Sequence, residues 1–299
     1  MNETLDPPST GSDASSAAGS EAADRDVAKR AIRGHADTAS PIPRPLEWMW
    51  AARWGLPLAV IAVAVSIWHV IVVLSGTKLF PTPWEVVLGI VELAREGALF
   101  KYVVASLFRV TWGFFLALAI GIPFGLVLGW FPLARIAFNP LIQGLRPISP
   151  IAWIPIAILW FGIKDSAPIF LIFLASLFPI TVSAAAAVQN MQPVYLRAAR
   201  NFGLTRPQLF RLVIFPAALP QILTGIRIAL GVAWLVVVAA EMIAVTSGLG
   251  YLINDARNAS RYDLVVAGMV LIGAIGFVLD IIVRRMERFD QVRWGYPDK

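Results

Sequence analysis

The sequence predicts an all-α integral membrane protein, a polytopic bundle of six transmembrane helices. Two observations carry this prediction. Hydrophobic residues make up 58% of the chain and charged residues only 15%, with a mean hydropathy of +0.72, whereas a soluble domain carries about 25% charged residues. The apolar residues also gather into runs of the length that a helix needs to cross a bilayer, about 20 residues.

The first segment, residues 1–45, is rich in Ser, Ala, Asp, Gly and Pro and has almost no large apolar side chains. Such a segment cannot bury enough apolar surface to fold. It also lacks the basic start and short apolar run of a secretory signal. We expect a disordered cytosolic N-terminal tail over residues 1–45 and a membrane domain over residues 46–299.

Six apolar runs follow, separated by polar or charged segments. The third and fifth carry Arg146 and Arg227 near their starts, and a long arginine side chain can place its charge at the membrane surface. Prolines in several runs remove backbone donors and can kink a helix. The expected spans are Leu56–Leu74, Ser106–Trp130, Leu141–Ile163, Ala167–Val188, Gln221–Val245 and Leu264–Val283.

Small residues recur every four positions in the second and fifth spans. Residues at this spacing share one helix face, and small side chains there let two helix backbones approach closely in lipid. The pattern therefore predicts tight helix packing. The residues are Gly113, Ala117, Gly121, Gly125 and Gly129, then Gly225, Ala229 and Ala233.

The loop charges predict the topology. An even number of spans places both termini on one side of the membrane, and that side carries an excess of arginine, whereas the other side mixes basic with acidic residues. Arginine and lysine concentrate in cytoplasmic loops, so we expect both termini and the Tyr195–Pro220 loop in the cytosol. The arginines are Arg44, Arg53, Arg135, Arg197, Arg200, Arg206, Arg211, Arg284, Arg285, Arg288 and Arg293.

Residues and motifs that are absent from the sequence argue against several classes of function. There is no cysteine, and His35 and His69 lie far from other plausible ligands, so we expect no metal site and no cofactor. No G-x-x-x-x-G-K-[ST] or H-E-x-x-H motif occurs, so we expect no enzyme activity and an outside energy source for active transport. The net charge of +6 has a topological origin in a membrane protein and does not indicate nucleic acid. A self-contained secondary transporter or channel is the alternative class, but it would need midplane acids and paired repeats.

The Tyr195–Pro220 loop is the most informative segment. Gly203 can take the left-handed conformation that ends a helix, and Thr205 and Pro207 suit the start of a second short helix. This pattern predicts a helix–Gly–helix unit at the cytosolic surface. The alternative is a simple amphipathic loop that lies on the membrane.

Charged groups inside a membrane are functional candidates, and Glu241 is the strongest of them here. Two interpretations are open: a group on a cavity wall or gate, and a carboxylate satisfied at the outer interface by water or by Arg109. Trp153 and Trp234 could line a cavity, although helix packing or the aromatic belt at the membrane interface is the favoured interpretation for each. The candidates for a translocation path or gate are therefore Glu241, Arg109, Trp153 and Trp234.

Several motifs together carry a family resemblance. The loop has Ala198-Ala199, Gly203-Leu204 and the segment Val213-Ile214-Phe215-Pro216, and Ala240-Glu241 is followed by Ser247–Leu252. With these motifs, the chain from about Leu56 to Arg293 resembles the transmembrane permease subunit of type I ATP-binding-cassette (ABC) importers. It most resembles the branch for alkanesulfonates, taurine and nitrate.

The resemblance implies a fold, partners and a role for the loop. The chain would have the type I ABC importer transmembrane-domain fold in a bacterial inner membrane, among lipid. It would work with two cytosolic ABC ATPase subunits, a second permease copy (homodimer or close heterodimer) and an extracytoplasmic substrate-binding protein. The substrate would be a small anion, first an aliphatic sulfonate, with nitrate, taurine or a small heterocycle as alternatives. Arg197 stands where the family often has Glu. The ATPase-coupling residues would be Arg197, Ala198, Ala199, Gly203, Leu204, Val213, Phe215, Pro216 and Pro220.

The six-span topology can be tested with reporter fusions. We expect fusions at Lys299 and within Ser247–Tyr262 to report opposite sides of the membrane, because the two positions are separated by one span. Activity of a cytosolic reporter at Lys299 and of an exported reporter in the other segment is the expected pair of results. Both fusions on one side would contradict the six-span topology.

Overall fold

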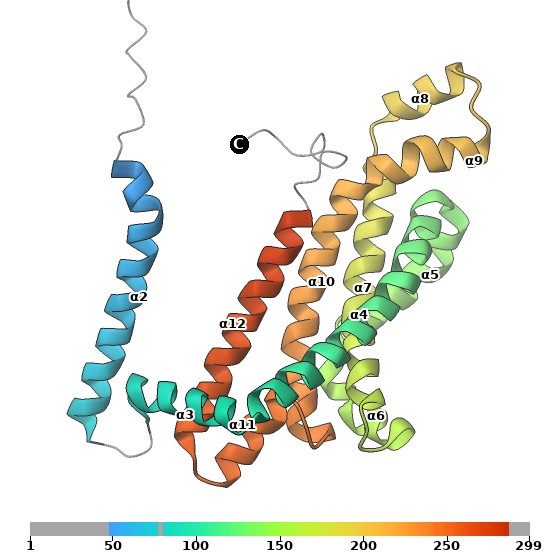
Figure 1. Ribbon diagram of the computed structural model, residues 1–299. Coiled ribbons are helices and arrows are strands. Elements are labelled where there is room, and N and C mark those ends of the chain that lie inside the picture. The colour runs from blue at the N-terminus through green and yellow to red at the C-terminus, as the bar shows by residue number, and fades with distance from the viewer. Residues whose placement is uncertain (1–47, 77–79, 287–299) are drawn as a thin grey trace, which may run out of the picture. The chain divides into compact units, whose positions relative to one another are not determined.

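A computed structural model of the protein describes residues 48–76 and 80–286 (Figure 1). The predicted tail over residues 1–45 lies outside the described residues. Within the described ranges the secondary structure is entirely helical. Its elements are α2 (Trp48–Ser75), α3 (Pro83–Arg95), α4 (Ala98–Trp130), α5 (Pro132–Leu145), the 3-10 turn η1 (Pro150–Trp153), α6 (Ile154–Phe161), α7 (Ser166–Gln189), α8 (Pro193–Asn201), α9 (Arg206–Leu209), the π-helical turn η2 (Phe210–Ile214), α10 (Phe215–Ala244), α11 (Leu249–Asn258) and α12 (Tyr262–Met286).

The chain divides into two compact units between Ser66 and Ile67. The division falls inside α2, which is apolar and long enough to cross a membrane over Gly55–Ser75. The helices from α3 onward belong to the second unit, and all further description concerns that unit. By length and composition, the described residues contain five helices that could span a membrane, or six if the bent pair described below counts as one.

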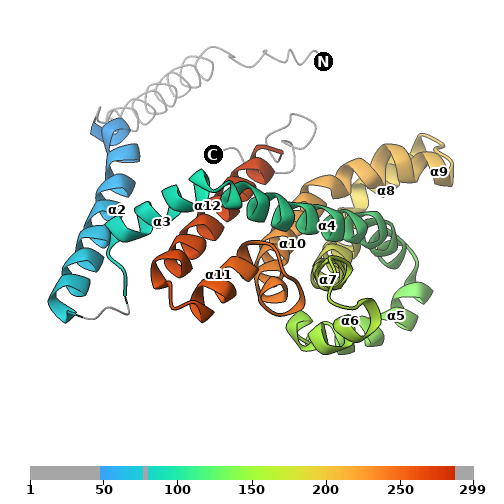
Figure 2. The ribbon, with the colours of Figure 1, turned by 60° about the horizontal axis from the view of Figure 1, so that its bottom comes forward.

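Helices α4, α7 and α10 form the centre of the second unit, as Figure 2 shows with α7 seen end-on. The predicted stripe of small residues on α4 faces α7. A side chain at Gly113 would lie 2.7 Å from the Ile169 carbonyl oxygen, and one at Gly129 would lie 2.7 Å from Val188 Cβ. Close backbone approach of two helices is what such a stripe permits in lipid, so the prediction of tight packing is confirmed for α4.

The third expected span, Leu141–Ile163, is wrong as a single helix. Helix α5 begins earlier, at Pro132, and ends at Leu145, and the η1–α6 segment leaves it at an angle of 84°. Pro147 and Pro150 lie at the break. Neither has a backbone N–H, so the helical hydrogen-bond ladder cannot continue through them.

The other spans agree in position but differ at their ends. Helix α4 begins at Ala98 rather than at Ser106, and α10 begins at Phe215 rather than at Gln221. Pro216 lies in the first turn of α10, where the missing N–H costs little, and Pro220 lies inside the helix. The turn η2 joins α9 directly to α10.

Two helices, α3 and α11, were not predicted. Both lie at the end of this unit opposite α8 and α9 (Figure 1). Helix α3 starts with a capping box in which the Thr82 N–H donates to Glu85 Oε2 at 2.7 Å and the Glu85 N–H donates to Thr82 Oγ1 at 3.3 Å. Short polar-faced helices of this kind lack the long apolar run by which spans are recognised.

An ion cluster fixes α3 to the turn between α11 and α12. The Arg261 guanidinium donates to Glu92 Oε2 at 2.7 Å and to Asp263 Oδ2 at 2.8 Å. Hydrogen bonds to Asp263 and then to Glu92 raise the pKa of Arg261 above its ordinary value. The three side chains are partly exposed, so the cluster positions these elements more than it stabilises them.

The contact between α4 and α7 can be tested with Gly125→Ala. A Cβ at Gly125 would overlap the Thr181 carbonyl oxygen and lie 2.7 Å from Ala184 Cβ. Overpacking of this kind lowers the free energy of unfolding by about 1–3 kcal/mol. Unfolding of the purified protein in mixed micelles by sodium dodecyl sulfate measures the effect.

The matched control is Gly273→Ala in α12, where a Cβ would meet nothing within 4 Å. We expect it to be neutral or to stabilise by about 0.5–1 kcal/mol, because alanine is the better helix former. Equal effects of the two substitutions would contradict the close α4–α7 contact.

Candidate functional site

Two features of the second unit can carry function, and they lie at opposite ends of it. One is the α8–α9 unit, which we define as Pro193–Leu209; the end that carries it is called the loop end. The other is a buried charged cluster formed by Ser106, Arg109, Asp165, Glu241 and Ser247, called the Arg109 cluster. Figure 1 shows α8 and α9 projecting beyond the long helices at the loop end.

The turn of the α8–α9 unit is built around Gly203. This residue has φ +70°, a conformation that glycine takes freely. The Gly203 N–H donates to the Arg200 carbonyl at 3.0 Å and the Leu204 N–H donates to the Ala199 carbonyl at 3.2 Å. This is the Schellman pattern that closes a helix end, so the predicted conformation of Gly203 is present.

The second helix starts as expected. Thr205 is the N-cap of α9, and Gln208 Oε1 accepts from the Thr205 N–H at 2.9 Å. Pro207 lies in the first turn. The helix–Gly–helix geometry is therefore fixed by local hydrogen bonds at both ends of the turn.

A small apolar core holds the α8–α9 unit in place. Ala199, Leu209 and Ile214 are buried in it, and Trp130 from the end of α4 and Val188 from α7 pack against it. The unit is thus anchored to two long helices. A flexible loop that merely lies on a membrane would not need such a core.

The outer face of α8 is apolar and exposed. Val194, Ala198 and Phe202 share one helix face because they are four residues apart, and Phe202 is 84% exposed. Arg197 is exposed beside them. Sequence analysis missed Val194 and Phe202, although their spacing together with Ala198 was the available signal. Exposed apolar patches with a polar rim mark interaction sites.

Not every predicted loop residue lies on this face. Ala198 is exposed, but Ala199 is buried and Leu204 is half-buried in the core of the unit. Val213 lies in η2, and Phe215 and Pro216 lie in the first turn of α10. Pro220 is buried inside α10. Ala199 and Leu204 therefore belong to the core of the α8–α9 unit, and the other four residues lie in the turn η2 and the helix α10 that follow it.

Arg109 is the centre of the cluster at the other end. Its side chain is 1% exposed, yet its five N–H groups all find acceptors. Nη1 donates to Glu241 Oε1 and to the Ser247 carbonyl, each at 2.7 Å. Nε and Nη2 donate to Asp165 Oδ1 at 2.9 and 2.6 Å, and Nη2 donates to Ser247 Oγ at 2.5 Å.

Glu241 is fully buried and is satisfied in the same way. Its Oε2 accepts from the Ser106 hydroxyl at 2.8 Å and from the Gly250 N–H at 3.0 Å. The Ser106 hydroxyl oxygen accepts from the Leu249 N–H at 2.9 Å. Side chains of α4 and α10 therefore cap the first turn of α11, whose N-terminal N–H groups attract negative charge.

The close packing around Glu241 explains why the Ser247–Leu252 segment has glycine at positions 248 and 250. Gly248 has φ +106°, and a Cβ there would overlap the Glu241 carboxylate. A Cβ at Gly250 would overlap the Val238 carbonyl oxygen. The backbone can approach Glu241 closely only because both positions lack side chains.

Sequence analysis left open whether Glu241 borders a cavity or gate, or is satisfied by water or Arg109. In the structure Glu241 is paired with Arg109. The Glu241 carboxylate is fully buried among these partners. Sequence analysis missed Ser106 as a second side-chain partner of Glu241, and it missed Asp165 and Ser247 as the other acceptors of Arg109. Asp165 lies in the turn before α7, far in sequence from both Arg109 and Glu241, so no local spacing could have joined it to them.

The two tryptophans lie apart from the cluster. Trp234 is buried and its Nε1–H donates to the Ile272 carbonyl at 3.1 Å, which ties α10 to α12. Trp153 borders a cavity at the break between α5 and α6 together with Arg146 and Phe178. The structure does not bring the four predicted path residues into one site.

Comparison with known proteins identifies the family. Residues 121–289, more than half of the chain, match the family described as "Binding-protein-dependent transport system inner membrane component". The chain belongs to this family. It is a permease, the membrane component of an ABC transporter, and it contains several membrane-spanning helices.

Curated relatives of this permease agree with the family. It is 37% identical to the taurine transport system permease protein of Escherichia coli K12 over 254 residues, which cover 82% of the chain and 92% of that protein. It is 37% identical to a putative aliphatic sulfonates transport permease of Bacillus subtilis, covering 79% and 86%. It is 32% identical to the nitrate import permease of Synechocystis, covering 81% and 91%.

A solved structure supports the fold. The permease matches a chain of the MetNI methionine ABC transporter with a TM-score of 0.53 and 22% identity, covering 64% of the permease and 97% of that chain. The expected transmembrane-domain fold is therefore confirmed. The match is to a chain from an inward-facing conformation of that transporter.

The Arg109 cluster can be tested by removing one carboxylate at a time. Glu241→Ala leaves Arg109 buried beside an empty position, and breaking a buried ion pair costs about 3–5 kcal/mol. Asp165→Ala removes the other carboxylate, but its side chain is 57% exposed and water can replace it, so we expect a loss of about 1 kcal/mol or less.

Thermal unfolding of the purified permease in detergent measures both. The pair is matched because each substitution removes one carboxylate from the same guanidinium. A loss for Asp165→Ala as large as that for Glu241→Ala would contradict the view that the Glu241 pair is the buried, stabilising one.

Proposed function

We propose that this permease forms the membrane pathway of an ATP-driven importer for a small anion, first an aliphatic sulfonate. Nitrate, taurine and a small heterocycle are the alternatives. The support is the chemistry shared by the relatives, whose names specify taurine, aliphatic sulfonates and nitrate. Each of these carries a compact oxyanion group.

The proposal that an outside ATPase drives the transport depends on one observation, the continuous helical run from Arg206 to Ala244, which is 39 residues long. At 1.5 Å per residue it extends about 58 Å. It starts in the α8–α9 unit and ends just beyond Glu241 in the Arg109 cluster. A rigid element of this length can carry a movement at the loop end to the opposite end.

We infer that the exposed face of α8 docks into a groove of an ABC ATPase subunit. The apolar stripe of Val194, Ala198 and Phe202 would enter the groove, and the arginines around it would meet its rim. Arg197 would there present a positive charge where related permeases often have a negative one. ATP binding would close the ATPase pair, move the α8–α9 unit and tilt α10.

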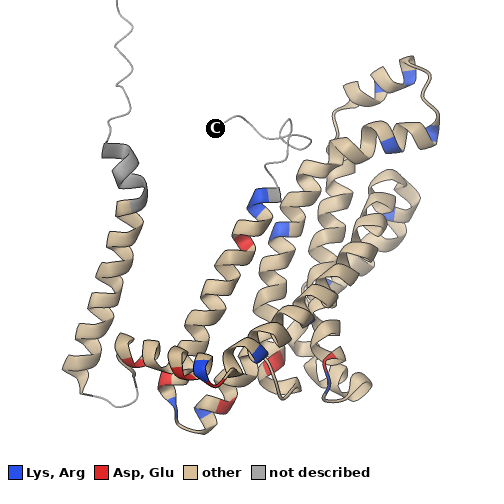
Figure 3. Cartoon of the chain, viewed as in Figure 1, with Lys and Arg blue, Asp and Glu red and all other residues tan. Residues whose placement is uncertain are grey.

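The proposed orientation places the loop end in the cytosol and both termini with it. Figure 3 shows lysine and arginine without neighbouring acids on α8 and α9, whereas basic and acidic residues mix at the opposite end. Cytoplasmic segments carry such an arginine excess. The opposite end, with α3, α11 and the Arg109 cluster, would face the extracytoplasmic binding protein.

The proposed complex contains two permease copies and two ATPase subunits, because one permease supplies only one wall of a pathway. The permease itself would be non-catalytic, and ATP hydrolysis would occur in the partner. The Arg109 cluster would act as a brace near the outer mouth: it joins α4, α10, the α6–α7 turn and the start of α11, so these segments move as one body when α10 tilts.

The coupling role predicts that Gly203→Val uncouples the complex. Valine at φ +70° is strained by about 1–3 kcal/mol, and relief of this strain would turn α8 relative to α9. We expect normal membrane abundance with weaker co-purification of the ATPase subunit and little uptake. Pull-down and uptake at matched amounts of protein measure this.

Gly97→Val is the matched control. Gly97 has φ +69° and open space around it, like Gly203, but it lies between α3 and α4 at the opposite end. We expect its ATPase co-purification to be normal. If Gly203→Val keeps normal co-purification and uptake, the α8–α9 unit is not the coupling element.

A further inference from the structure

A polar cavity lies between α5 and α7 near the loop end. Its volume is about 220 Å³. A cavity of this volume is large enough for several water-sized groups. Neither the coupling role of the α8–α9 unit nor the Arg109 cluster accounts for it. Residues of α5 and α7 line it, among them Arg135, Asn139, Ile142, Gln143, Val182 and Gln189.

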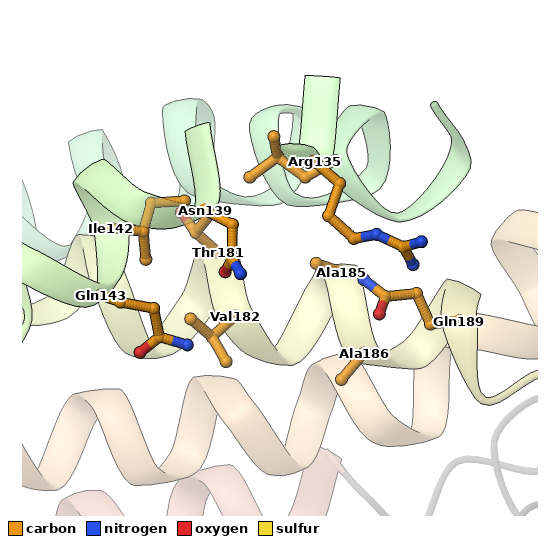
Figure 4. A pocket seen from close by; sticks show the side chains of 10 residues that line it. Arg135, Asn139, Ile142, Gln143, Thr181, Val182, Ala185, Ala186 and Gln189 are labelled. Atoms are coloured by element: carbon orange, nitrogen blue, oxygen red, sulfur yellow. The ribbon is translucent and has the colours of Figure 1, made fainter. Parts of the chain in front are cut away.

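The polar side chains of the cavity form a stripe on one helix. Arg135, Asn139 and Gln143 are four residues apart, so they share one face of α5, which is otherwise largely apolar. Figure 4 shows the side chains of Asn139 and Gln143 extending from α5 toward α7, with Arg135 and Gln189 near one another at one end of the cavity. Polar groups at such positions in membrane helices face a cavity or a partner and mark functional sites.

These side chains have unused hydrogen-bonding capacity. The side chains of Arg135, Asn139, Gln143 and Gln189 make no hydrogen bond or ion pair with any of the described residues. The guanidinium offers five N–H donors, and each carboxamide offers two more. The arrangement contrasts with Arg109, whose donors are all used inside the chain.

The chemistry of the walls selects one class of ligand. One cationic group and three amides are suited to a compact oxyanion with a single negative charge, and no acidic residue borders the cavity to repel it. Ile142, Val182 and Ala186 supply an apolar surface beside the polar stripe. A short alkyl chain attached to the oxyanion would fit against that surface.

We propose that this cavity is a binding site for the transported anion on the loop-end half of the pathway. Arg135 holds the charge, Asn139, Gln143 and Gln189 hold the oxyanion oxygens, and Ile142 and Val182 contact the alkyl part. The inference rests on the proposed function, because it takes its ligand from the proposed substrate class. It adds a position and a set of residues within this chain.

The test is equilibrium binding of radiolabelled ethanesulfonate to the complete permease–ATPase complex in nanodiscs, without the binding protein. We expect saturable binding that unlabelled nitrate and ethanesulfonate compete away and that ethylammonium, a cation of similar size, does not. Arg135→Gln should raise the dissociation constant at least about tenfold, as expected for the loss of a charge-assisted hydrogen bond. Asn139→Leu should weaken binding as well.

Arg285→Gln is the matched control. Arg285 is exposed at the last turn of α12, also at the loop end, but it does not border the cavity, so binding should be unchanged. ATPase co-purification with each variant shows that the complex is intact. Loss of co-purification in Arg135→Gln with unchanged anion binding would assign the stripe to a protein contact and overturn the site.

Different experimental results would overturn the proposed binding site and the proposed substrate class. Equal binding by wild type, Arg135→Gln and Arg285→Gln, or no saturable binding at all, overturns the site. Absence of uptake of both sulfonate and nitrate by the wild-type complex with its binding protein overturns the proposed substrate class. Uptake by wild type without Arg135-dependent binding keeps the function and rejects the site.

Discussion

The burial of Arg109 is the constraint on which the end of the structure opposite the α8–α9 unit depends. A guanidinium removed from water is costly unless every donor is paired, and the acceptors here come from Asp165, Glu241 and Ser247. Asp165 lies before α7, and Glu241 and Ser247 lie at the end of α10 and just after it, all far in sequence from Arg109. The requirement to satisfy one side chain therefore fixes the relative positions of α4, α10, the α6–α7 turn and the start of α11.

Glycine extends this constraint to the backbone. Gly248 and Gly250 let the start of α11 approach Glu241, and the small residues of α4 let α7 lie against it. Apolar side chains gain little from packing against each other rather than against lipid, so close backbone contact and polar pairing hold the helices together. The same unit thus uses close packing at its centre and charge pairing at one end.

Three regions of the unit differ in the chemical groups that they leave available to a partner. The donors of Arg109 are all satisfied within the chain, which suits a brace. The stripe on α5 has none of its donors satisfied within the described residues, which suits a ligand. The α8 face instead exposes apolar groups with arginines around them, which suits a protein partner. The 39-residue helical run from Arg206 to Ala244 connects the Arg109 cluster at one end of the unit with the α8–α9 unit at the other.

The sequence by itself determined the class of protein, the approximate position of most spans and the turn at Gly203. These properties depend on local composition and local backbone preference: apolar runs of bilayer length, small residues four apart, and a glycine between two helix signals. The family resemblance follows from motifs that are also local. Each of these properties can be recognised without knowing which segments meet.

Only the tertiary structure decided how far the third span bends, the presence of α3 and α11 and the full set of contacts in the Arg109 cluster. The apolar run over Leu141–Ile163 predicts a span, and the prolines after Arg146 permit a break in it. The angle of 84° between the two parts is a property of the tertiary structure, in which η1 and α6 pack against α7. Helices α3 and α11 are too short and too polar to be recognised by hydropathy, and they are held by contacts to other segments. Arg109 was a candidate partner of Glu241 from the sequence. The contact of Glu241 with Ser106, and of Arg109 with Asp165 and Ser247, could not be predicted, because it depends on how helices distant in sequence pack together.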